Sequence, residues 1–289
     1  MVNIRSLTTR EVARLCRVSD ATVKRWTEAG LLVSERTSGG HRRFRVEEVA
    51  RFQRESELGV RQTGADESAA KTAALGRTTK KSQSDSPLFH ALVGGRETET
   101  TEILISAFVR GGTLAHIFDT ILFETMNRIG ELWFAGELNI ADEHLATRTL
   151  LNAVQKLRRV IPASEANGKL AMCCTMEGDL HELPAHLAQI ILESAGLEVL
   201  NFGANLPLYV LGKEVLQHRP QLVCLSAAVL PDLERAAHDY KEFRNNISKA
   251  NLSVVLGGRV FADEQMRRRF PAELHADSFS ALAEFANRL

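Results

Sequence analysis

Asp179 and His181 stand two residues apart in a short polar segment of the 289-residue chain. An apolar run, 170–175, precedes this segment and an amphipathic run, 185–195, follows it, which is the pattern of a strand, a turn and a helix. In parallel α/β sheets, ligands bind outside the carboxyl ends of the strands, where such a turn lies. A histidine there can offer one ring nitrogen to a metal while a carboxylate holds the other. The pair is therefore a candidate metal site, and the alternative is an ordinary polar turn.

The spacing resembles the Asp-x-His-x-x-Gly signature of cobalamin-binding domains, with Pro184 where that family has glycine. In those domains the histidine replaces the cofactor's own lower base on cobalt, and the aspartate orients it. The resemblance therefore implies that His181 is the metal ligand, to the cobalt of cobalamin, and that Asp179 positions its ring. Proline suits the first turn of a helix, so we expect the fold to be kept here.

The last 120 residues alternate apolar runs with amphipathic ones. The apolar runs predict strands at 170–175, 198–202, 222–226, 254–256 and 275–277. This alternation predicts a doubly wound, flavodoxin-like parallel sheet. Ser226 ends the third strand, and Gly257 and Gly258 follow the fourth. In cobalamin domains a serine and paired glycines at these positions bind the buried nucleotide tail. Glycine allows the tail to approach the backbone closely, and serine donates a hydrogen bond to it. The family's Ser-x-Leu is Ser-Ala-Ala here.

Residues 87–160 repeat apolar side chains at helical spacing and predict a small helical bundle. Within it, Trp133 precedes a glycine turn, and Glu143 and His144 follow that turn. An indole can lie against a large apolar macrocycle. The arrangement resembles the cap that covers the upper face of cobalamin in methionine synthase and its relatives, which implies cofactor binding by these three residues. Burial of Trp133 in the bundle and solvation of the other two are the alternatives.

A different pattern occupies the first 57 residues. Thr8 and Glu11 form a capping box that opens one helix, and Ser19 caps a second helix, which Gly30 ends. Two short helices around a tight turn predict a helix-turn-helix.

A hairpin and a third helix follow. The hairpin strands are predicted at 31–33 and 43–45, and the helix begins near Val46. The order of motifs, T-x-x-E-V-A, V-S-x-x-T-V-K-R-W, G-L-L and R-x-x-G-G-H-R-R-F, resembles the winged helix-turn-helix of MerR-family regulators, which work as dimers. Side chains of the second helix and the hairpin suit the grooves and phosphates of double-stranded operator DNA. They are Thr22, Lys24, Arg25, His41, Arg42 and Arg43. For Lys24 and Arg25 the alternative is a solvated face.

Charge supports this assignment locally. Lysine plus arginine and aspartate plus glutamate number 36 each, so the whole chain has no formal net charge. Residues 1–57 carry 12 basic and 8 acidic side chains, an excess of +4, and the remainder carries −4. The four cysteines form no Cys-x-x-Cys pair, and there is no signal sequence or membrane-length apolar run. We therefore expect a cytoplasmic protein with free thiols and no membrane partner.

The predicted organisation has four parts. A segment rich in serine, threonine and glycine separates the head from the bundle and predicts a flexible linker. The boundaries are 1–57 for the winged helix-turn-helix DNA-binding domain, 58–86 for the linker, 87–162 for the helical-bundle cobalamin cap and 168–289 for the Rossmann-like cobalamin-binding domain.

These parts follow in the same order in the light-sensing, MerR-type repressors of the CarH type. The resemblance implies a DNA-binding transcriptional repressor that holds adenosylcobalamin between Trp133 and His181. It also implies a homo-oligomer (dimer or tetramer) that occupies its operator in the dark and releases the DNA when light cleaves the cobalt–carbon bond. In the best-known members a histidine after the cap tryptophan ligates cobalt after photolysis. Here that residue is Phe134, which cannot coordinate a metal.

Two other functions fit part of the pattern. A regulator of the same architecture could sense cobalamin or another ligand without light. A corrinoid methyl carrier would account for residues 87–289 but not for the head. Because the sequence holds no acid/base constellation and no catalytic barrel, we expect no enzymatic activity.

Overall fold

The structure, a computed structural model, describes residues 6–16, 18–37, 39–45, 48–49, 51–52, 86–162 and 164–289. The chain divides into two compact units. Unit 1 takes in the chain up to Gly112 together with Glu124–Val160, and unit 2 takes in Thr113–Phe123 together with Ile161–Leu289. The four predicted domain boundaries stay predictions. The predicted linker lies outside the described residues except for Ser86.

Two capped helices begin unit 1. Helix α1, Thr9–Leu15, opens with the predicted capping box, in which the Glu11 amide donates to Thr8 Oγ1 over 3.2 Å and the Thr8 amide donates to Glu11 Oε2 over 2.7 Å. Helix α2, Asp20–Glu28, begins after Ser19, whose hydroxyl accepts a hydrogen bond in its first turn. Each cap satisfies amides that have no partner inside the helix. The two predicted helices are confirmed.

A small antiparallel sheet accompanies these helices. Its strands are β1, Leu7–Thr8, β2, Glu35–Arg36, and β3, Arg42–Phe44, in the order β1-β3-β2. Residues 48, 49, 51 and 52 are helical, and Val49 and Phe52 among them are buried. Positions 46, 47 and 50 of the predicted third helix lie outside the described residues.

The strand predicted at 31–33 is wrong. The amides of Leu31 and Leu32 donate to the Trp26 carbonyl at the end of α2, and the Val33 amide donates to Glu48 Oε1. Since all three N–H groups are engaged, none is available for a strand ladder. Leu32 alone is buried, and its neighbours are 55% and 61% exposed. Strand pairing therefore begins later, at Glu35.

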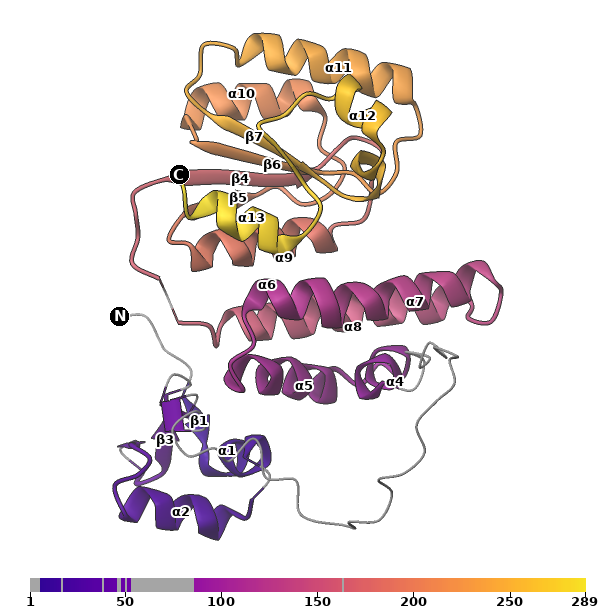
Figure 1. Cartoon of the computed structure of the whole chain (residues 1–289). Helices are drawn as coiled ribbons and strands as arrows, with labels where there is room; N and C mark the ends of the chain where they lie inside the picture. The colour runs from indigo at the N-terminus through magenta and orange to yellow at the C-terminus, as the bar shows by residue number, and fades with distance from the viewer. Residues whose placement is uncertain are drawn as a thin grey trace, which may run out of the picture. The chain divides into compact units, whose positions relative to one another are not determined.

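The helical pattern that begins at residue 87 is confirmed. The main helices are α4, Pro87–Val93, α5, Glu97–Val109, α7, Phe123–Phe134, and α8, Ile140–Arg158. Helices α4 and α5 pack against each other and against α8 (Figure 1). Their apolar stripes bury Leu92, Leu104, Leu150 and Val154.

A polar contact fixes α5 against α8. The Glu97 carboxylate accepts hydrogen bonds from Lys156 Nζ over 2.5 Å and from Asn152 Nδ2 over 2.9 Å. The Lys156 ammonium and the Asn152 amide hold the pKa of Glu97 below its usual value. The contact joins the first turn of α5 to the second half of α8, so it sets the register of the two helices.

One helical run contains a turn that the apolar pattern does not reveal. Residues Ile117–Leu122 form a π-helix between α6, Leu114–His116, and α7. Within unit 2, Asp119 of this turn caps helix α13, Phe279–Ala286. Asp119 Oδ1 accepts from the Phe279 amide over 2.7 Å, and Oδ2 accepts from the amide and the hydroxyl of Ser280 over 3.0 and 2.7 Å. A carboxylate at a helix N-terminus is stabilised both by these bonds and by the helix dipole.

Unit 2 contains the predicted parallel sheet. Its strands are β4, Leu170–Thr175, β5, Glu198–Asn201, β6, Leu222–Ser226, β7, Ser253–Gly257, and β8, Leu274–Ala276. They are all parallel, in the order β5-β4-β6-β7-β8. With the strands counted from β4, this is the flavodoxin-like order, and β4 lies at the switch point between its two neighbours.

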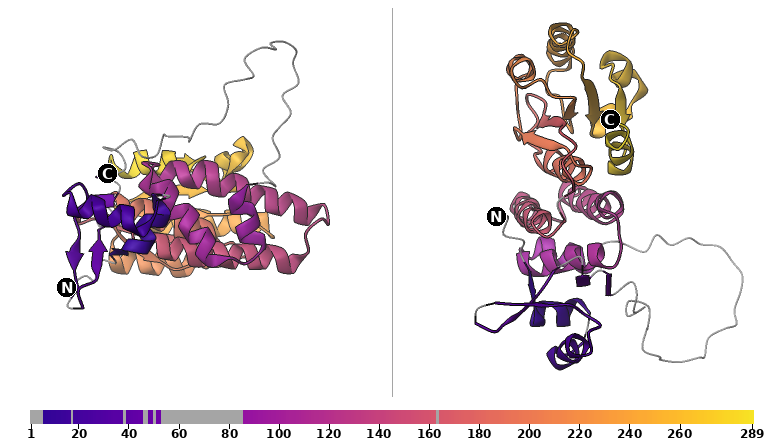
Figure 2. Two further views of the ribbon diagram at one scale, coloured as in Figure 1. Left: turned by 90° about the horizontal axis from the view of Figure 1, so that it is seen from below. Right: turned by 90° about the vertical axis from the view of Figure 1, so that its left-hand side faces the viewer.

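Helices cover both faces of this sheet (Figures 1 and 2). One face carries α9, Leu183–Ser194, together with α13; the other carries α10, Leu208–His218, and α11, Leu233–Asn246. The 3₁₀ turn Arg259–Ala262 and the short helix α12, Glu264–Arg269, connect β7 to β8. Seen along the strands, the helices appear end-on around the sheet in the right panel of Figure 2.

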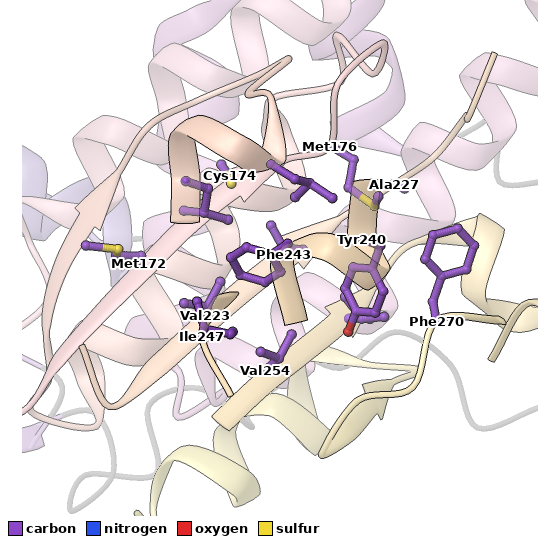
Figure 3. Packing of buried hydrophobic residues seen from close by; sticks show 14 of the residues in the cluster. Met172, Cys174, Met176, Val223, Ala227, Tyr240, Phe243, Ile247, Val254 and Phe270 are labelled. Carbon is purple, nitrogen blue, oxygen red and sulfur yellow. The ribbon is translucent and has the colours of Figure 1, made fainter. Parts of the chain in front are cut away.

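The main core of unit 2 lies between the sheet and the α10–α11 layer (Figure 3). Met172, Val223 and Val254 project from three neighbouring strands toward Phe243 and Tyr240 of α11. Each such side chain contributes about 1.5–3 kcal/mol when it is fully buried. The Tyr240 hydroxyl donates to the Pro271 carbonyl over 2.7 Å, which satisfies its one polar group, and burial raises the pKa of the phenol.

We predict that Asp119→Ala destabilises the protein by about 1–3 kcal/mol, because it leaves the first amides of α13 without their acceptor. The midpoint of urea denaturation of the full chain, followed by circular dichroism, should fall. Glu131→Ala is the matched control: it removes a carboxylate from α7 whose ion pair with Arg128, at 3.3 Å, is exposed, and it should change stability by less than about 0.5 kcal/mol. Equal midpoints for both variants would contradict the capping role of Asp119.

Candidate cofactor site and nucleic-acid interface

Small side chains line the carboxyl edge of the parallel sheet. The strand register places Thr175 beside Ser226, Ser226 beside Gly257, and Gly257 beside Ala276. These four residues come from the ends of β4, β6, β7 and β8. Because none of them has a long side chain, a ligand can approach the backbone closely along this edge.

The Asp179–His181 pair lies in the loop that follows β4. Asp179 is fully buried, and its Oδ1 accepts from His181 Nδ1 over 2.6 Å and from the His181 amide over 2.9 Å. Its Oδ2 accepts from the Ala228 amide, in the loop after β6, over 2.6 Å. The His181 side chain is 59% exposed. The carboxylate is therefore anchored on both oxygens, and the imidazole that it holds reaches the surface.

These bonds fix the charge of the aspartate and the tautomer of the histidine. Burial acts to raise the pKa of Asp179, but the hydrogen bonds from the His181 ring and from the amides of Ala228 and His181 outweigh it and lower the pKa. An ionised carboxylate can only accept, so Nδ1 is the nitrogen that carries the proton. The lone pair of the neutral ring then lies on Nε2, the nitrogen that a metal would take.

Ser226 and Gly258 provide two further features of a ligand site. Ser226 Oγ is buried and is one of two buried side-chain polar atoms among the described residues without a hydrogen-bond partner, the other being Arg128 Nε. Gly258 has φ of +103°, and a Cβ there would lie 2.5 Å from the Ala227 carbonyl oxygen. Gly257 is less constrained, since its Cβ would make an ordinary 3.6 Å contact with the Ala276 carbonyl oxygen.

These features fit the cobalamin that the sequence resemblance implies. The imidazole offers cobalt a neutral nitrogen ligand, and the orphaned Ser226 hydroxyl offers a buried hydrogen bond to a polar tail. Glycine is required at 258 because a Cβ there would clash with the Ala227 backbone, so this loop lies close against the residue that follows Ser226. Pro184 lies in the first turn of α9, as predicted, so the departure from the family's glycine leaves the helix intact.

Trp133, Glu143 and His144 flank one turn in unit 1. Trp133 lies at the end of α7, 45% exposed, and the next residue, Phe134, is 88% exposed. Five residues, 135–139, lead from there to α8, and both Glu143 and His144 lie in its first turns. Glu143 Oε1 accepts from the Thr147 hydroxyl over 2.8 Å, and His144 is exposed. The burial of Trp133 in the bundle core, the alternative to a cap, does not occur in the structure.

The six residues predicted to contact DNA lie on α2 and the β2–β3 hairpin. Lys24 and Arg25 are exposed on α2, and Thr22 is half-buried beside them. Arg25 Nη2 donates to Thr22 Oγ1 over 3.4 Å. Both positive groups project from the helix that follows the turn, the element that enters the major groove in helix-turn-helix proteins.

The hairpin residues differ from one another in their availability. His41 is exposed at the tip of the hairpin. Arg42 forms an ion pair with Glu28 at the end of α2, at 3.0 Å, and Arg43 donates from Nη1 to the Arg42 carbonyl over 3.1 Å. The pair between Arg42 and Glu28 ties the hairpin to α2. The charge of Arg42 is therefore already partly balanced, which the sequence did not indicate.

The predicted residues form three groups in the structure. Asp179, His181, Ser226, Gly257 and Gly258 gather at one edge of the sheet in unit 2. Trp133, Glu143 and His144 share the turn between α7 and α8, and the remaining six share the head.

Sequence reasoning missed three groups that hold the Asp179 loop: the Ala228 amide, Thr175 and Asn205. The role of the Ala228 backbone amide cannot be predicted from the sequence, because every residue except proline carries such an amide. Thr175 and Asn205 had a weak signal, because Thr175 is a polar residue that ends β4 and Asn205 is a polar residue in the loop that follows β5.

Two family models match separate parts of the chain. The model described as "Helix-turn-helix domain" matches residues 6–57, and the model described as "B12 binding domain" matches residues 86–158. The second match covers the helices on which Trp133, Glu143 and His144 lie. The chain thus combines a helix-turn-helix domain with a B12-binding domain, which supports a B12-binding regulator of transcription.

The chain is similar to curated proteins of two kinds. Over 177 residues it is 23% identical to the dimethylamine corrinoid protein 1 of Methanosarcina acetivorans, covering 61% of this chain and 83% of that protein. Over 151 residues it is 28% identical to the HTH-type transcriptional repressor CarH of Myxococcus xanthus, covering 51% of this chain and 48% of the repressor. The second alignment therefore spans about half the length of each protein.

A solved structure shares the fold. The monomethylamine corrinoid protein of Methanosarcina barkeri superposes with a TM-score of 0.60 at 18% sequence identity, covering 70% of this chain and 95% of that protein. The likeness shows that helices combined with a parallel α/β sheet form the same fold as in that corrinoid protein. Among the described residues, we find no helix with the length and apolar character needed to span a membrane.

We predict that Asp179→Asn removes a pH-dependent part of the stability. Because the pKa of Asp179 is lowered by folding, its stabilisation is complete above the ordinary carboxyl pKa of about 3.9 and is lost as the pH falls through the lower folded value. The wild-type protein should exceed the variant by about 1–3 kcal/mol at neutral pH, and the difference should shrink below about pH 4. Thermal midpoints from pH 2.5 to 7, the range chosen to bracket that pKa of about 3.9, provide the measurement.

Glu273 is the other described carboxylate of unit 2 with a lowered pKa, and it is present in both proteins, so the difference between them isolates Asp179. Parallel pH profiles for the two proteins would show that Asp179 does not hold the loop through its charge.

Proposed function

We propose that this chain is a cobalamin-dependent transcriptional repressor of the CarH type, which binds operator DNA through its head and responds to light through adenosylcobalamin held by His181. One observation carries the proposal. A buried carboxylate fixes Nδ1 of a half-exposed imidazole at the ligand-binding edge of a parallel sheet, in a chain that also has a helix-turn-helix domain.

The residues of unit 2 would hold the lower face and the tail of the cofactor. His181 Nε2 would be the cobalt ligand, and Asp179 keeps its ring in the tautomer that has a lone pair at that nitrogen. The Ser226 hydroxyl would donate to the tail, and Gly257 and Gly258 would admit it. When bound, adenosylcobalamin supplies a cobalt–carbon bond that light can cleave.

The residues of the α7–α8 turn would cover the upper face. Trp133 offers an exposed indole, and Glu143 and His144 offer a carboxylate and an imidazole from the following helix. The match of the B12-binding model to residues 86–158 supports a cofactor role for this turn. Phe134 contributes apolar surface and no metal ligand, so His144 is the imidazole of this turn that could approach cobalt after light.

The head would bind duplex DNA through Lys24, Arg25 and Thr22 of α2 and through His41, Arg42 and Arg43 of the hairpin. We place this activity in the cytoplasm, in a homodimer or homotetramer. A head this small presents few phosphate contacts, so its affinity alone is low. Joining heads in one oligomer raises the effective concentration of each, and an assembly that depends on the cofactor would then control operator occupancy.

Two alternatives make different predictions. The similarity to dimethylamine corrinoid proteins favours, as a second candidate, a corrinoid carrier that presents a methyl group to another enzyme. The departure at Phe134 favours a regulator that binds cobalamin but does not depend on light. We favour the repressor, without catalytic activity of its own, because a carrier does not need the head and because His144 still provides the α7–α8 turn with an imidazole despite Phe134.

A single purification separates these functions. The protein is loaded with adenosylcobalamin, and its visible spectrum and its elution volume are recorded in darkness and after green light. The proposal predicts a bound corrinoid, a spectral change and a change in size. A bound corrinoid that changes neither its spectrum nor the size of the protein under light supports the light-independent regulator, and methyl transfer to an added acceptor supports the carrier.

We predict that His181→Ala weakens binding of adenosylcobalamin at least ~10-fold, because loss even of groups that orient a metal ligand costs 10–100-fold. Equilibrium dialysis followed by the visible spectrum measures the bound corrinoid. His238→Ala is the control, since His238 lies on α11 and pairs only with Glu242 among the contacts described, at 3.6 Å. Unchanged uptake and an unchanged spectrum in His181→Ala would refute the proposed cobalt ligand.

We predict that Lys24→Ala reduces the dependence of DNA affinity on salt. Loss of one phosphate contact lowers the slope of log affinity against log salt by about 1. Fluorescence anisotropy with a mixed-sequence duplex, at several salt concentrations, measures the slope. Lys213→Ala removes a cation from α10, outside the head, and should leave the slope unchanged. If both variants keep the wild-type slope, Lys24 does not contact phosphate.

A further inference from the structure

We propose that Asn205 is a positioning residue that locks the loop carrying Asp179 and His181, and thereby fixes where the His181 imidazole is presented to a corrin-held cobalt. The part of this inference that concerns cobalt rests on the proposed cobalamin function. Its structural part, the lock on the loop, stands on hydrogen bonds within unit 2.

Asn205 has an unusual backbone conformation. Its φ is +58°, and Arg219 is the one other non-glycine residue among those described with a positive φ. This left-handed region is costly for side chains with a Cβ, and asparagine is one of the residues that tolerate it best. Asn205 lies in the loop between β5 and α10, and β5 is a neighbour of β4 in the sheet. The conformation turns both the amide and the side chain of Asn205 to the β4–α9 loop, as their contacts show.

Asn205 makes three hydrogen bonds to the end of β4 and the loop after it. Its side-chain Oδ1 accepts from the Gly178 amide over 2.8 Å. Its own amide donates to Thr175 Oγ1 over 2.9 Å and to the Asp179 carbonyl over 3.0 Å. The turn that precedes His181 is therefore held from its start to Asp179 by one residue that is more than 25 positions away in the sequence.

Thr175 completes the lock. It is fully buried at the end of β4, and its hydroxyl donates to the Asp179 carbonyl over 2.6 Å while it accepts from the Asn205 amide. Both hydrogen-bonding roles of the hydroxyl are used, so its rotation is fixed. Since the Asp179 carboxylate is held separately by the Ala228 amide, the backbone and the side chain of this residue are anchored independently.

Pro231, in the loop after β6, lies close to the turn at Gly178. Gly178 has φ of +88°, and a Cβ at this position would lie 2.9 Å from Pro231 Cδ. Pro231 therefore confines the turn on one side while Asn205 holds the Gly178 amide from another. Ligand geometry at a metal site is retained only when such supporting contacts fix the first ligand. Two of these contacts come from side chains, the Asn205 amide oxygen and the Thr175 hydroxyl, and Asn205 is the residue whose substitution also tests the left-handed backbone.

The chain offers a matched pair of substitutions. Asn205→Gly keeps the left-handed backbone, which glycine adopts freely, and removes the Oδ1 acceptor. Asn205→Asp keeps both the conformation and an acceptor. We expect both variants to fold, as judged by circular dichroism. We expect Asn205→Gly to bind adenosylcobalamin about 10–100-fold more weakly, and Asn205→Asp to bind it as the wild type does.

Two readouts separate positioning from general stability. In ¹⁵N-labelled protein loaded with unlabelled cob(II)alamin, electron paramagnetic resonance reports a protein nitrogen ligand as a doublet superhyperfine splitting, whereas the cofactor's own base would give a triplet. Asn205→Gly should weaken the doublet. In cofactor-free protein, ¹⁵N resonances of His181 should show the Nδ1–H tautomer for the wild type and for Asn205→Asp. Asn205→Gly should show a mixture of tautomers. The inference is overturned if Asn205→Gly matches the wild type in both readouts, or if Asn205→Asp fails as badly as Asn205→Gly.

These results also separate the inference from the proposed function. A wild-type protein that binds no corrinoid refutes the function, and the histidine resonances then decide on the lock by themselves. A wild-type protein that shows a nitrogen ligand, together with an unaffected Asn205→Gly, leaves the function standing and refutes the lock.

Discussion

The buried Asp179 carboxylate is the constraint on which the site depends. An ionised carboxylate removed from water costs several kcal/mol unless its oxygens accept hydrogen bonds from the protein. Here the donors are the His181 ring, the His181 amide and the Ala228 amide. The hydrogen bond that stabilises the buried carboxylate therefore also orients the imidazole, and the same bond selects one tautomer of the ring. A short Asp-x-His sequence becomes a site of fixed geometry only because the fold buries the first of the two residues.

The sheet order makes this burial possible. Strand β4 lies between β5 and β6, so the loop that follows it has a neighbouring loop on each side. The loop after β6 supplies the Ala228 amide and the loop after β5 supplies Asn205. A strand at the edge of the sheet would have only one of these neighbours. The position of β4 at the switch point thus provides two independent supports, which is a physical reason why ligands gather at such points.

Much of the fold could be predicted from the sequence because it depends on local patterns. The five parallel strands, the capping box at Thr8 and the first turn of α9 all follow from residue types within a few positions. The strand predicted at 31–33 failed because its amides close the end of α2, a use that apolar residue types do not reveal. The cap from Asp119 to α13 joins segments 160 residues apart, so no local pattern could indicate it.

In the candidate site, too, some residues could be predicted from local patterns and others could not. Asp179, His181, Ser226 and the paired glycines could be named from type and spacing, and the structure gathers them at one edge. The donors that hold them could not, since Ala228 acts through its backbone and Asn205 through a left-handed conformation that only the folded chain defines. Arg42 shows the opposite error. Its type suits phosphate, but its ion pair with Glu28 has to be weakened before it can contact DNA with its full charge.

The proposed regulation follows from a contrast between two groups of residues that we assign to the cofactor, the Asp179 loop of unit 2 and the α7–α8 turn of unit 1. In unit 2, Asp179 and Thr175 are fully buried and their side-chain oxygens are hydrogen-bonded, which leaves them little freedom to change when the cofactor changes. The α7–α8 turn offers Trp133 and Phe134 as exposed apolar side chains. A signal can shift a conformational equilibrium only through groups that bind differently in the two states. In the proposed repressor we assign these groups to the α7–α8 turn, while the hydrogen-bonded Asp179 loop would keep the cofactor in place.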